Sequence, residues 1–121
     1  MAKNFIRDGD SITYLNQGAS VILSGTTVAV GNLLGVTLVD IPVGGSGAVA
    51  IEGVYSLSKV SAAVIAQGET VVYKAGSGNI DDNLAALVTG DLSAGCVAAK
   101  AAGAGALTVD VLLNVGANTV T

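Results

Sequence analysis

Apolar and polar residues alternate with a period of two along much of this chain, a pattern typical of half-buried β-strands. In the longest such run, residues 107–114, Leu107, Val109, Val111 and Leu113 occupy every second position. Shorter runs with the same alternation occupy residues 11–14, 27–30, 36–38, 49–52 and 70–74. Each of these segments is predicted to be a strand.

Glycine-rich turn signals separate the runs at short intervals, because glycine supplies the positive φ angles that tight turns need. Many short strands at this spacing predict an all-β fold, either a small antiparallel β-barrel or a sandwich. Residues 60–66 and 81–88 are predicted to add short helical turns, the second because its acidic start suits a helix N-terminus. The length of 121 residues and the lack of a visible domain boundary predict that residues 1–121 form a single β domain, with residues 1–9 as a candidate N-terminal arm. No internal repeat is apparent.

The composition points to a core of small side chains. The chain is 51% hydrophobic, 12% charged and 3% aromatic, with 17 glycines among its 121 residues. Alanine, valine and leucine dominate the apolar fraction, so we expect a thin core. The low charge also suggests that some apolar surface is buried against other chains, since permanent interfaces are more apolar than transient ones.

Charge and hydropathy exclude several kinds of partner. The net charge is −4, and the five basic residues are spread along the chain. No stretch therefore supplies the cluster of Lys and Arg that nucleic-acid binding requires. The most apolar stretch, residues 92–107, is rich in Ala and Gly and contains Lys100, so no membrane span is predicted. The N-terminus lacks a signal-peptide pattern, and the single Cys96 cannot form an internal disulfide. Both features predict synthesis in a host cytoplasm.

The segment GVYSLSKV, residues 53–60, resembles a phosphate-binding loop. Gly53 and Lys59 have the required separation, but Ser58 replaces the second glycine and Val60 replaces the hydroxyl residue that reaches magnesium. No βαβ pattern surrounds the segment. The interpretation favoured here is a strand over residues 49–55 followed by an exposed turn that carries Lys59.

No catalytic or cofactor-binding constellation is visible in the sequence. Histidine is absent, and Cys96 has apolar neighbours, so it is predicted to be a small buried side chain. The acidic groups Asp8-Gly9-Asp10, Asp81-Asp82 and Asp91 match no calcium-loop template and are read as solvated turns. No catalytic residue, no cofactor and no metal ligand is predicted. A structural calcium ion held by oxygen ligands from several loops stays an open alternative.

Three segments in order carry a family resemblance. They are MAKNFIRDGDSITY at the start, GAVAIEGVYSLSKVSAAVIAQGETVVYKAGSGNI in the middle and CVAAKAAGAGALTVDVLLN near the end. Together they resemble the phage capsid cement, or head decoration, family of small β proteins, whose members sometimes carry a recombinase-like label. The family pattern commonly has proline before the lysine of G-aromatic-x-L-x-K, where this chain has Ser58. That departure leaves the local turn in doubt and the strand order intact.

The resemblance implies a structural virion protein rather than an enzyme. Such a protein binds the outside of the expanded capsid and cements neighbouring major capsid proteins against the pressure of packaged DNA. Its implied partners are the major capsid protein and further copies of itself, with a homotrimer favoured over a dimer. Nucleic acid and membrane are not among them.

Candidate contact residues lie in three places. The first is the arm, at Lys3, Asn4, Phe5, Ile6 and Arg7, because a short terminal strand can add to the sheet edge of a neighbour. The second and third are turns of small residues that can approach a partner backbone closely. They contain Gly44 and Gly45, and Ala102 and Gly103.

Two other functions remain open. One is a β-structural subunit of the tail or baseplate, which the genomic neighbourhood would distinguish. The other is a host-surface binding module for glycans, against which the scarcity of aromatic residues counts.

Overall fold

The computed structural model describes residues 10–121, which form eleven short β-strands and no helix. The strands are β1 (Ser11–Leu15), β2 (Thr27–Val30), β3 (Leu33–Thr37), β4 (Ser46–Ala50), β5 (Val54–Ser58), β6 (Val72–Lys74), β7 (Asn79–Asp81), β8 (Leu92–Ser93), β9 (Val97–Ala98), β10 (Thr108–Leu112) and β11 (Thr119–Val120). The all-β prediction is confirmed. No helix in this part of the chain could span a membrane.

The predicted helical turns at residues 60–66 and 81–88 are wrong. In the first segment the amide of Ile65 donates to the carbonyl of Ala102, which lies in a distant segment, so the backbone is drawn away from a helical path. In the second segment a single turn bond, from the amide of Ala85 to the carbonyl of Asp82, replaces a helical ladder.

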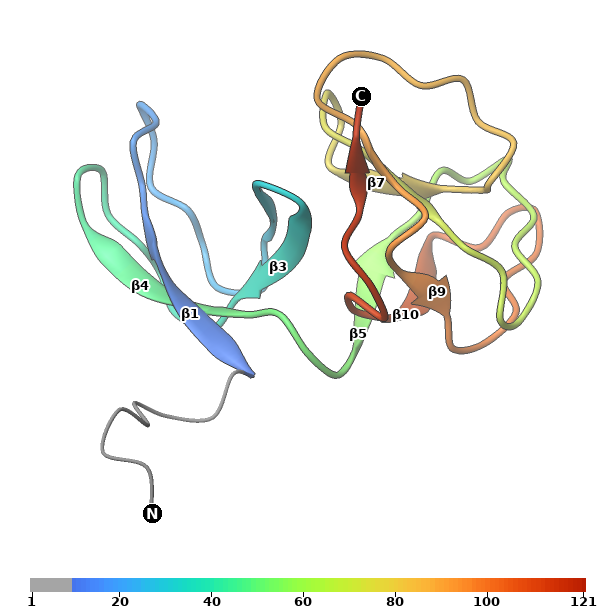
Figure 1. The fold of residues 1–121 in the computed structure, drawn as a ribbon, viewed down its shortest axis with the longest axis horizontal. Helices are drawn as coiled ribbons and strands as arrows, with labels where there is room; N and C mark the ends of the chain where they lie inside the picture. Colours follow the sequence, from blue (N-terminus) through green and yellow to red (C-terminus); the bar gives the residue numbers. More distant parts are fainter. Residues whose placement is uncertain (1–9) are drawn as a thin grey trace.

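The strands form three small antiparallel sheets arranged in two lobes (Figure 1). We call residues 10–52 the N-lobe and residues 53–121 the C-lobe. The N-lobe holds one sheet, in the order β1-β4-β3-β2. The C-lobe holds two sheets, in the orders β5-β10-β9 and β11-β8-β6-β7. No closed barrel forms among the described residues, so the sheets remain open.

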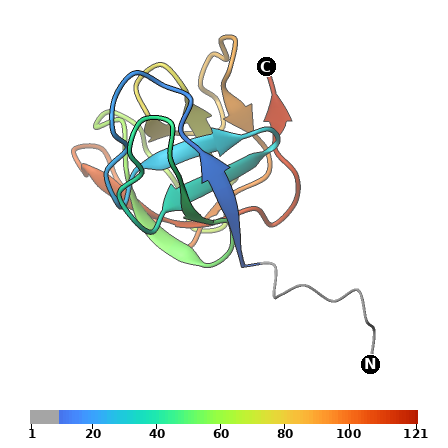
Figure 2. The same cartoon turned by 90° about the vertical axis from the view of Figure 1, so that its left-hand side faces the viewer.

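One buried apolar cluster joins the two lobes. Leu34 and Val36 of β3, in the N-lobe, pack into a cluster whose other members belong to the C-lobe, among them Ile80, Leu92 and Val111. Seen along the long axis in Figure 2, the C-lobe lies behind the sheet of the N-lobe. That the chain folds as a single domain stays a prediction, and this shared cluster supports it.

An asparagine side chain continues the sheet of the N-lobe. Strand β4 pairs with β3 at Val36 and Thr37 only, which leaves the edge of β3 at Leu34 without a strand partner on that side. The side chain of Asn114 fills this place: its Oδ1 accepts from the amide of Leu34 at 2.9 Å, and its Nδ2 donates to the carbonyl of Leu34 at 2.8 Å. The same Nδ2 donates to the carbonyl of Ile51 at 2.8 Å.

A pair of asparagines, Asn32 and Asn118, adds further hydrogen bonds between β3 and the C-terminal segment. The backbone N–H of Asn118 donates to the backbone carbonyl of Asn32 at 2.8 Å, and the side-chain Nδ2 of Asn32 donates to the backbone carbonyl of Asn118 at 2.7 Å. The Nδ2 of Asn118 also donates to the Oδ1 of Asn114 at 3.0 Å. We call Asn32, Asn114 and Asn118 the asparagine joint, because they connect β3 of the N-lobe to the C-terminal segment of the C-lobe.

The two lobes repeat one strand arrangement. Strand β1 pairs with β4 as β5 pairs with β10, and β4 pairs with β3 as β10 pairs with β9. The pairing of Thr27 with Val36, between β2 and β3, recurs as an isolated bridge between Thr70 and Val97. The prediction of no internal repeat is therefore wrong.

Each lobe also contains a matched pair of tight turns. In the N-lobe, Ile22 and Ile41 exchange two backbone hydrogen bonds, and each is followed by a turn. In the C-lobe, Ile65 and Ala102 do the same. The first turn of each pair follows the sequence V-I-x-x-G-x-T-V, at residues 21–28 and 64–71. Its glycine has a φ of 85° in the N-lobe and 81° in the C-lobe, which favours glycine at that position.

An insertion at residues 74–93 sets the C-lobe apart from the N-lobe. It contains β7, β8 and the loop between them, at the place where the N-lobe has only the short turn between β2 and β3. The buried carboxylate of Asp91 organises this insertion. It accepts from the Lys74 ammonium at 2.7 Å, from the amide of Val88 at 2.9 Å and from the amide of Ala75 at 3.0 Å.

Candidate interaction surfaces

Of the predicted contact residues, those of the arm lie outside the described part of the chain. These are Lys3, Asn4, Phe5, Ile6 and Arg7. The first described residue is Asp10, which immediately precedes β1. The arm contact therefore stays a prediction.

Gly44 and Gly45 form an anchored, exposed turn at the outer end of the N-lobe (Figure 1). The amide of Gly45 donates to the carbonyl of Pro42 at 2.9 Å, and Gly44 has a φ of 76°. Buried Asn16 secures the turn through its backbone: its backbone N–H donates to the carbonyl of Gly45, and its backbone carbonyl accepts from the N–H of Gly44. The turn thus presents Val43, 57% exposed, on a fixed backbone.

Ala102 and Gly103 lie in the corresponding turn of the C-lobe, at the opposite end of the molecule in Figure 1. Ala102 is only 8% exposed, since it exchanges backbone hydrogen bonds with Ile65. Gly103 is exposed and begins the turn that the amide of Ala106 closes by donating to its carbonyl. Of the two, Gly103 has the surface for a contact, while Ala102 holds the turn in place.

Large apolar side chains are exposed around both turn pairs and on the insertion. Val21, Leu23 and Val43 surround the turns of the N-lobe, and Val64 and Leu107 flank those of the C-lobe. On the insertion, Leu84 is 89% exposed. Sequence reasoning anticipated exposed apolar surface but did not locate it, because the alternation pattern says nothing of turn residues.

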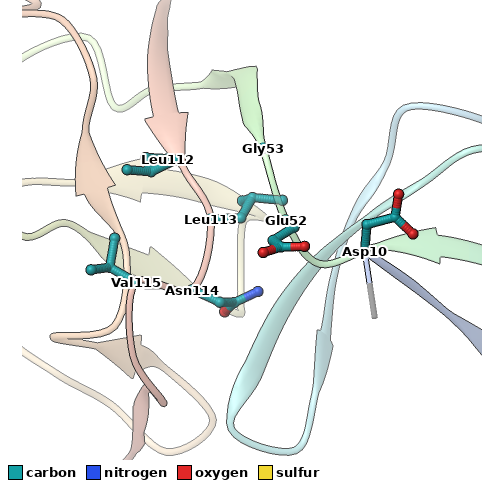
Figure 3. Close-up of a pocket in the computed structure, with 7 residues that line it drawn as sticks. All are labelled: Asp10, Glu52, Gly53, Leu112, Leu113, Asn114 and Val115. Atoms are coloured by element: carbon teal, nitrogen blue, oxygen red, sulfur yellow. The ribbon is translucent and has the colours of Figure 1, made fainter. Parts of the chain in front are cut away.

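An open groove of about 620 Å³ lies between the lobes (Figure 3). Leu112, Asn114 and Val115 line its C-lobe side, Asp10 lies on its N-lobe side, and Glu52 lies between them. Among residues 10–121, its lining combines two carboxylates with apolar side chains and includes no lysine or arginine. The groove begins at Asp10, the first described residue.

Lys59 is buried, so its predicted position on an exposed turn is wrong. The side chain is 4% exposed, and its ammonium donates to the carbonyls of Val60 at 2.7 Å and Ala63 at 2.5 Å. These carbonyls surround the ammonium and leave it unavailable to a phosphate. The likeness to a phosphate-binding loop therefore reflects a structural role of this lysine.

Asn16 performs the same task in the N-lobe. Its Nδ2 donates to the carbonyl of Ser20 at 2.9 Å, just as Lys59 donates to the carbonyl of Ala63, four residues further along the chain in both lobes. The backbone hydrogen bonds match too. The backbone N–H of Asn16 donates to the carbonyl of Gly45, and the backbone N–H of Lys59 donates to the carbonyl of Leu107. Sequence reasoning missed this equivalence because the two side chains differ chemically.

The remaining reactive groups are structural. Cys96 is 1% exposed, as predicted, and burial raises the pKa of its thiol above the ordinary value, which leaves it a poor nucleophile. The prediction that Asp91 lies in a solvated turn is wrong. The Lys74 ammonium and the amide of Val88 hold the pKa of the Asp91 carboxyl below its ordinary value. Among residues 10–121, no three His, Cys, Asp or Glu side chains are grouped to hold a metal ion.

The sequence pattern that defines the phage cement proteins matches residues 6–113. The chain therefore belongs to the phage cement protein family, which is structural and not enzymatic, and it has a capsid-stabilising structural role in the virion. A comparison with curated proteins found no match. The family resemblance drawn from the sequence is confirmed.

Proposed function

We propose that this protein binds the outside of the expanded phage capsid and ties neighbouring major capsid proteins together against the pressure of packaged DNA. The observation that carries the proposal is the placing of exposed apolar side chains on anchored turns at both outer ends of a protein of this family. Val43 marks one end and Leu107 the other. A protein with adhesive surfaces at two ends can bridge two partners.

The strength of such a bridge comes from area and from simultaneous contact. Each apolar contact contributes modestly, at about 25 cal/mol per Å² removed from water. Once one end is bound, the other meets its partner at a high effective concentration, so two weak ends give a strong attachment. A net charge of −4 also suits a position outside the shell, away from the DNA.

Copies of the chain are proposed to associate with one another as well, as a trimer in preference to a dimer. The support is the apolar surface that remains exposed away from the two ends and outside the insertion, above all Val115. The arm, with Phe5 and Ile6 between Lys3 and Arg7, is proposed as a further contact to the capsid by strand addition.

The test is a binding assay with purified capsids. The protein is expected to bind expanded capsids and to raise their resistance to heat or osmotic shock, while unexpanded procapsids and isolated tails serve as controls. Binding to tails but not to capsids would support the tail or baseplate function instead. A variant lacking residues 1–7 is expected to bind expanded capsids more weakly, and undiminished occupancy would remove the arm from the contact. Light scattering of the free protein measures the oligomer, and a monomer or dimer mass would contradict the trimer.

A further inference from the structure

We infer that the two lobes are equivalent docking ends, each binding the same surface of a capsid subunit, so that one chain joins two copies of one partner. This inference rests on the proposed function and goes beyond it, because it specifies that the two contacts are alike. It follows from the repeated arrangement of the lobes and from what that repetition places on the outside.

The frame behind each end is the same. In the N-lobe β1 pairs with β4 and β4 with β3, and in the C-lobe β5 pairs with β10 and β10 with β9. In each lobe two turns are also joined by an antiparallel bridge with a pair of backbone hydrogen bonds. The amide of Gly25 donates to the carbonyl of Thr37, and the amide of Gly68 donates to the carbonyl of Ala98. The turn pair is thus fixed to its sheet by the same contact in each lobe.

The exposed surface repeats along with the frame. Val21 and Val64 occupy the same place, directly before the bridging isoleucine, and they are 52% and 61% exposed. Beyond this pair the two surfaces share apolar character but not position: Val43, in the second turn of the N-lobe, is 57% exposed, and Leu107, directly after the second turn of the C-lobe, is 71% exposed. More than half of each valine side chain is exposed, so both positions have apolar surface that a partner can bury.

Both ends are also held rigid in the same way. Asn16 and Lys59 each fix the loop that leads to the first turn, from a buried position. A surface that is already ordered loses little conformational entropy on binding, so small apolar areas suffice. The two rigid, like surfaces would each accept one apolar site of matching shape.

The identity of the partner follows from this likeness. Two surfaces of the same form require two sites of the same form, and a shell built from many copies of one subunit supplies them. The insertion at residues 74–93 has no counterpart in the N-lobe, so its exposed Leu84 lies outside the shared surface and provides a matched control.

The test compares apolar-to-acidic substitutions at each end. One variant carries Val21→Asp and Val43→Asp, a second carries Val64→Asp and Leu107→Asp, a third combines all four, and the control carries Leu84→Asp. All of these positions are exposed, so each variant is expected to fold, and circular dichroism with thermal melting checks this. Binding is measured by titration on expanded capsids.

The two single-end variants are expected to lose apparent affinity to a similar extent, by about 10²- to 10⁴-fold, because each retains one end and loses the benefit of two-point attachment. The four-site variant is expected not to bind, and the control to bind as the wild type does. A large loss for one end with a change of less than about threefold for the other would overturn the inference while leaving the capsid function intact. If the two single-end variants lower the mass of the free oligomer equally and leave capsid binding unchanged, the inference is overturned, and the two ends are contacts between copies of the chain. Failure of the wild type itself to bind would instead remove the proposed function.

Discussion

At the scale of single residues, the most informative position is Lys59. A buried lysine is costly unless its charge is compensated, and among the described residues the ammonium of Lys59 meets backbone carbonyls and no carboxylate. Asn16 satisfies the same loop geometry with a neutral amide. The lysine therefore contributes to stability through its hydrogen bonds. Its resemblance to the lysine of a phosphate-binding loop does not indicate nucleotide binding.

Substitution of Lys59 by methionine is expected to destabilise the protein by about 2–3 kcal/mol, because the carbonyls of Val60 and Ala63 lose their donor inside the structure. The measurement is the free energy of unfolding in urea. Lys100→Met is the control, since Lys100 is exposed and its loss is expected to cost less than about 0.5 kcal/mol. Equal unfolding free energies for the two variants would refute a structural role of Lys59.

At the scale of elements, the alternation pattern located some of the longer strands well, but the single strand predicted over residues 49–55 is wrong, because β4 ends at Ala50 and β5 begins at Val54. Predicted segments at residues 11–14, 27–30 and 107–114 coincide with β1, β2 and β10. Strands of two or three residues, such as β8 and β9, were missed because they are too short to display a period. The sequence repeat at residues 21–28 and 64–71 was visible in principle, but the insertion that follows it in the C-lobe changes the spacing to the second turn, so the repeat does not continue at a fixed period.

The candidate surfaces were predictable only in part. Glycine marked the turns correctly, since Gly44 needs its positive φ, but sequence alone could not show that Ala102 faces inward while Gly103 faces out. The asparagine joint could not be predicted at all. Asn32 lies far in sequence from Asn114 and Asn118, and asparagine in a polar segment usually signals a simple turn.

Replacement of Asn114 by alanine is expected to cost about 2–4 kcal/mol, because Leu34 and Ile51 lose backbone partners and because alanine tolerates the φ of 47° poorly. Hydrogen exchange gives the sharper readout. The amide of Leu34 is expected to lose protection, while Asn83→Ala, an exposed substitution on the insertion, leaves it unchanged. Retained protection at Leu34 in the Asn114 variant would contradict the role assigned to the joint.

At the scale of the whole molecule, stability against acid depends on the insertion of the C-lobe. The Asp91 carboxyl has its pKa lowered in the folded protein, below the ordinary 3.8. Its ionised form therefore stabilises the fold. That contribution is fully present above the unfolded value and is lost as the pH falls through the lower folded value.

Wild-type protein is thus expected to lose unfolding free energy steeply as the pH falls below about 4, and Asp91→Asn to show a shallower loss over the same range. Urea titrations at several pH values measure this difference. Parallel curves for the two proteins would show that other carboxyl groups govern the acid sensitivity. The variant is also expected to be less stable at neutral pH, because Lys74 loses its buried anion.

The asparagine joint has a mechanical consequence. A load that pulls the outer ends of the lobes apart is carried by residues 51–53, by the buried cluster that Leu34 and Val36 share with the C-lobe, and by the side chains that fasten Asn114 and Asn118 to β3. If those fastenings release first, the three connecting residues can extend by at most about 10 Å before the backbone itself is taut. The molecule would then yield by a short, reversible stretch under a swelling shell, and its sheets would remain folded.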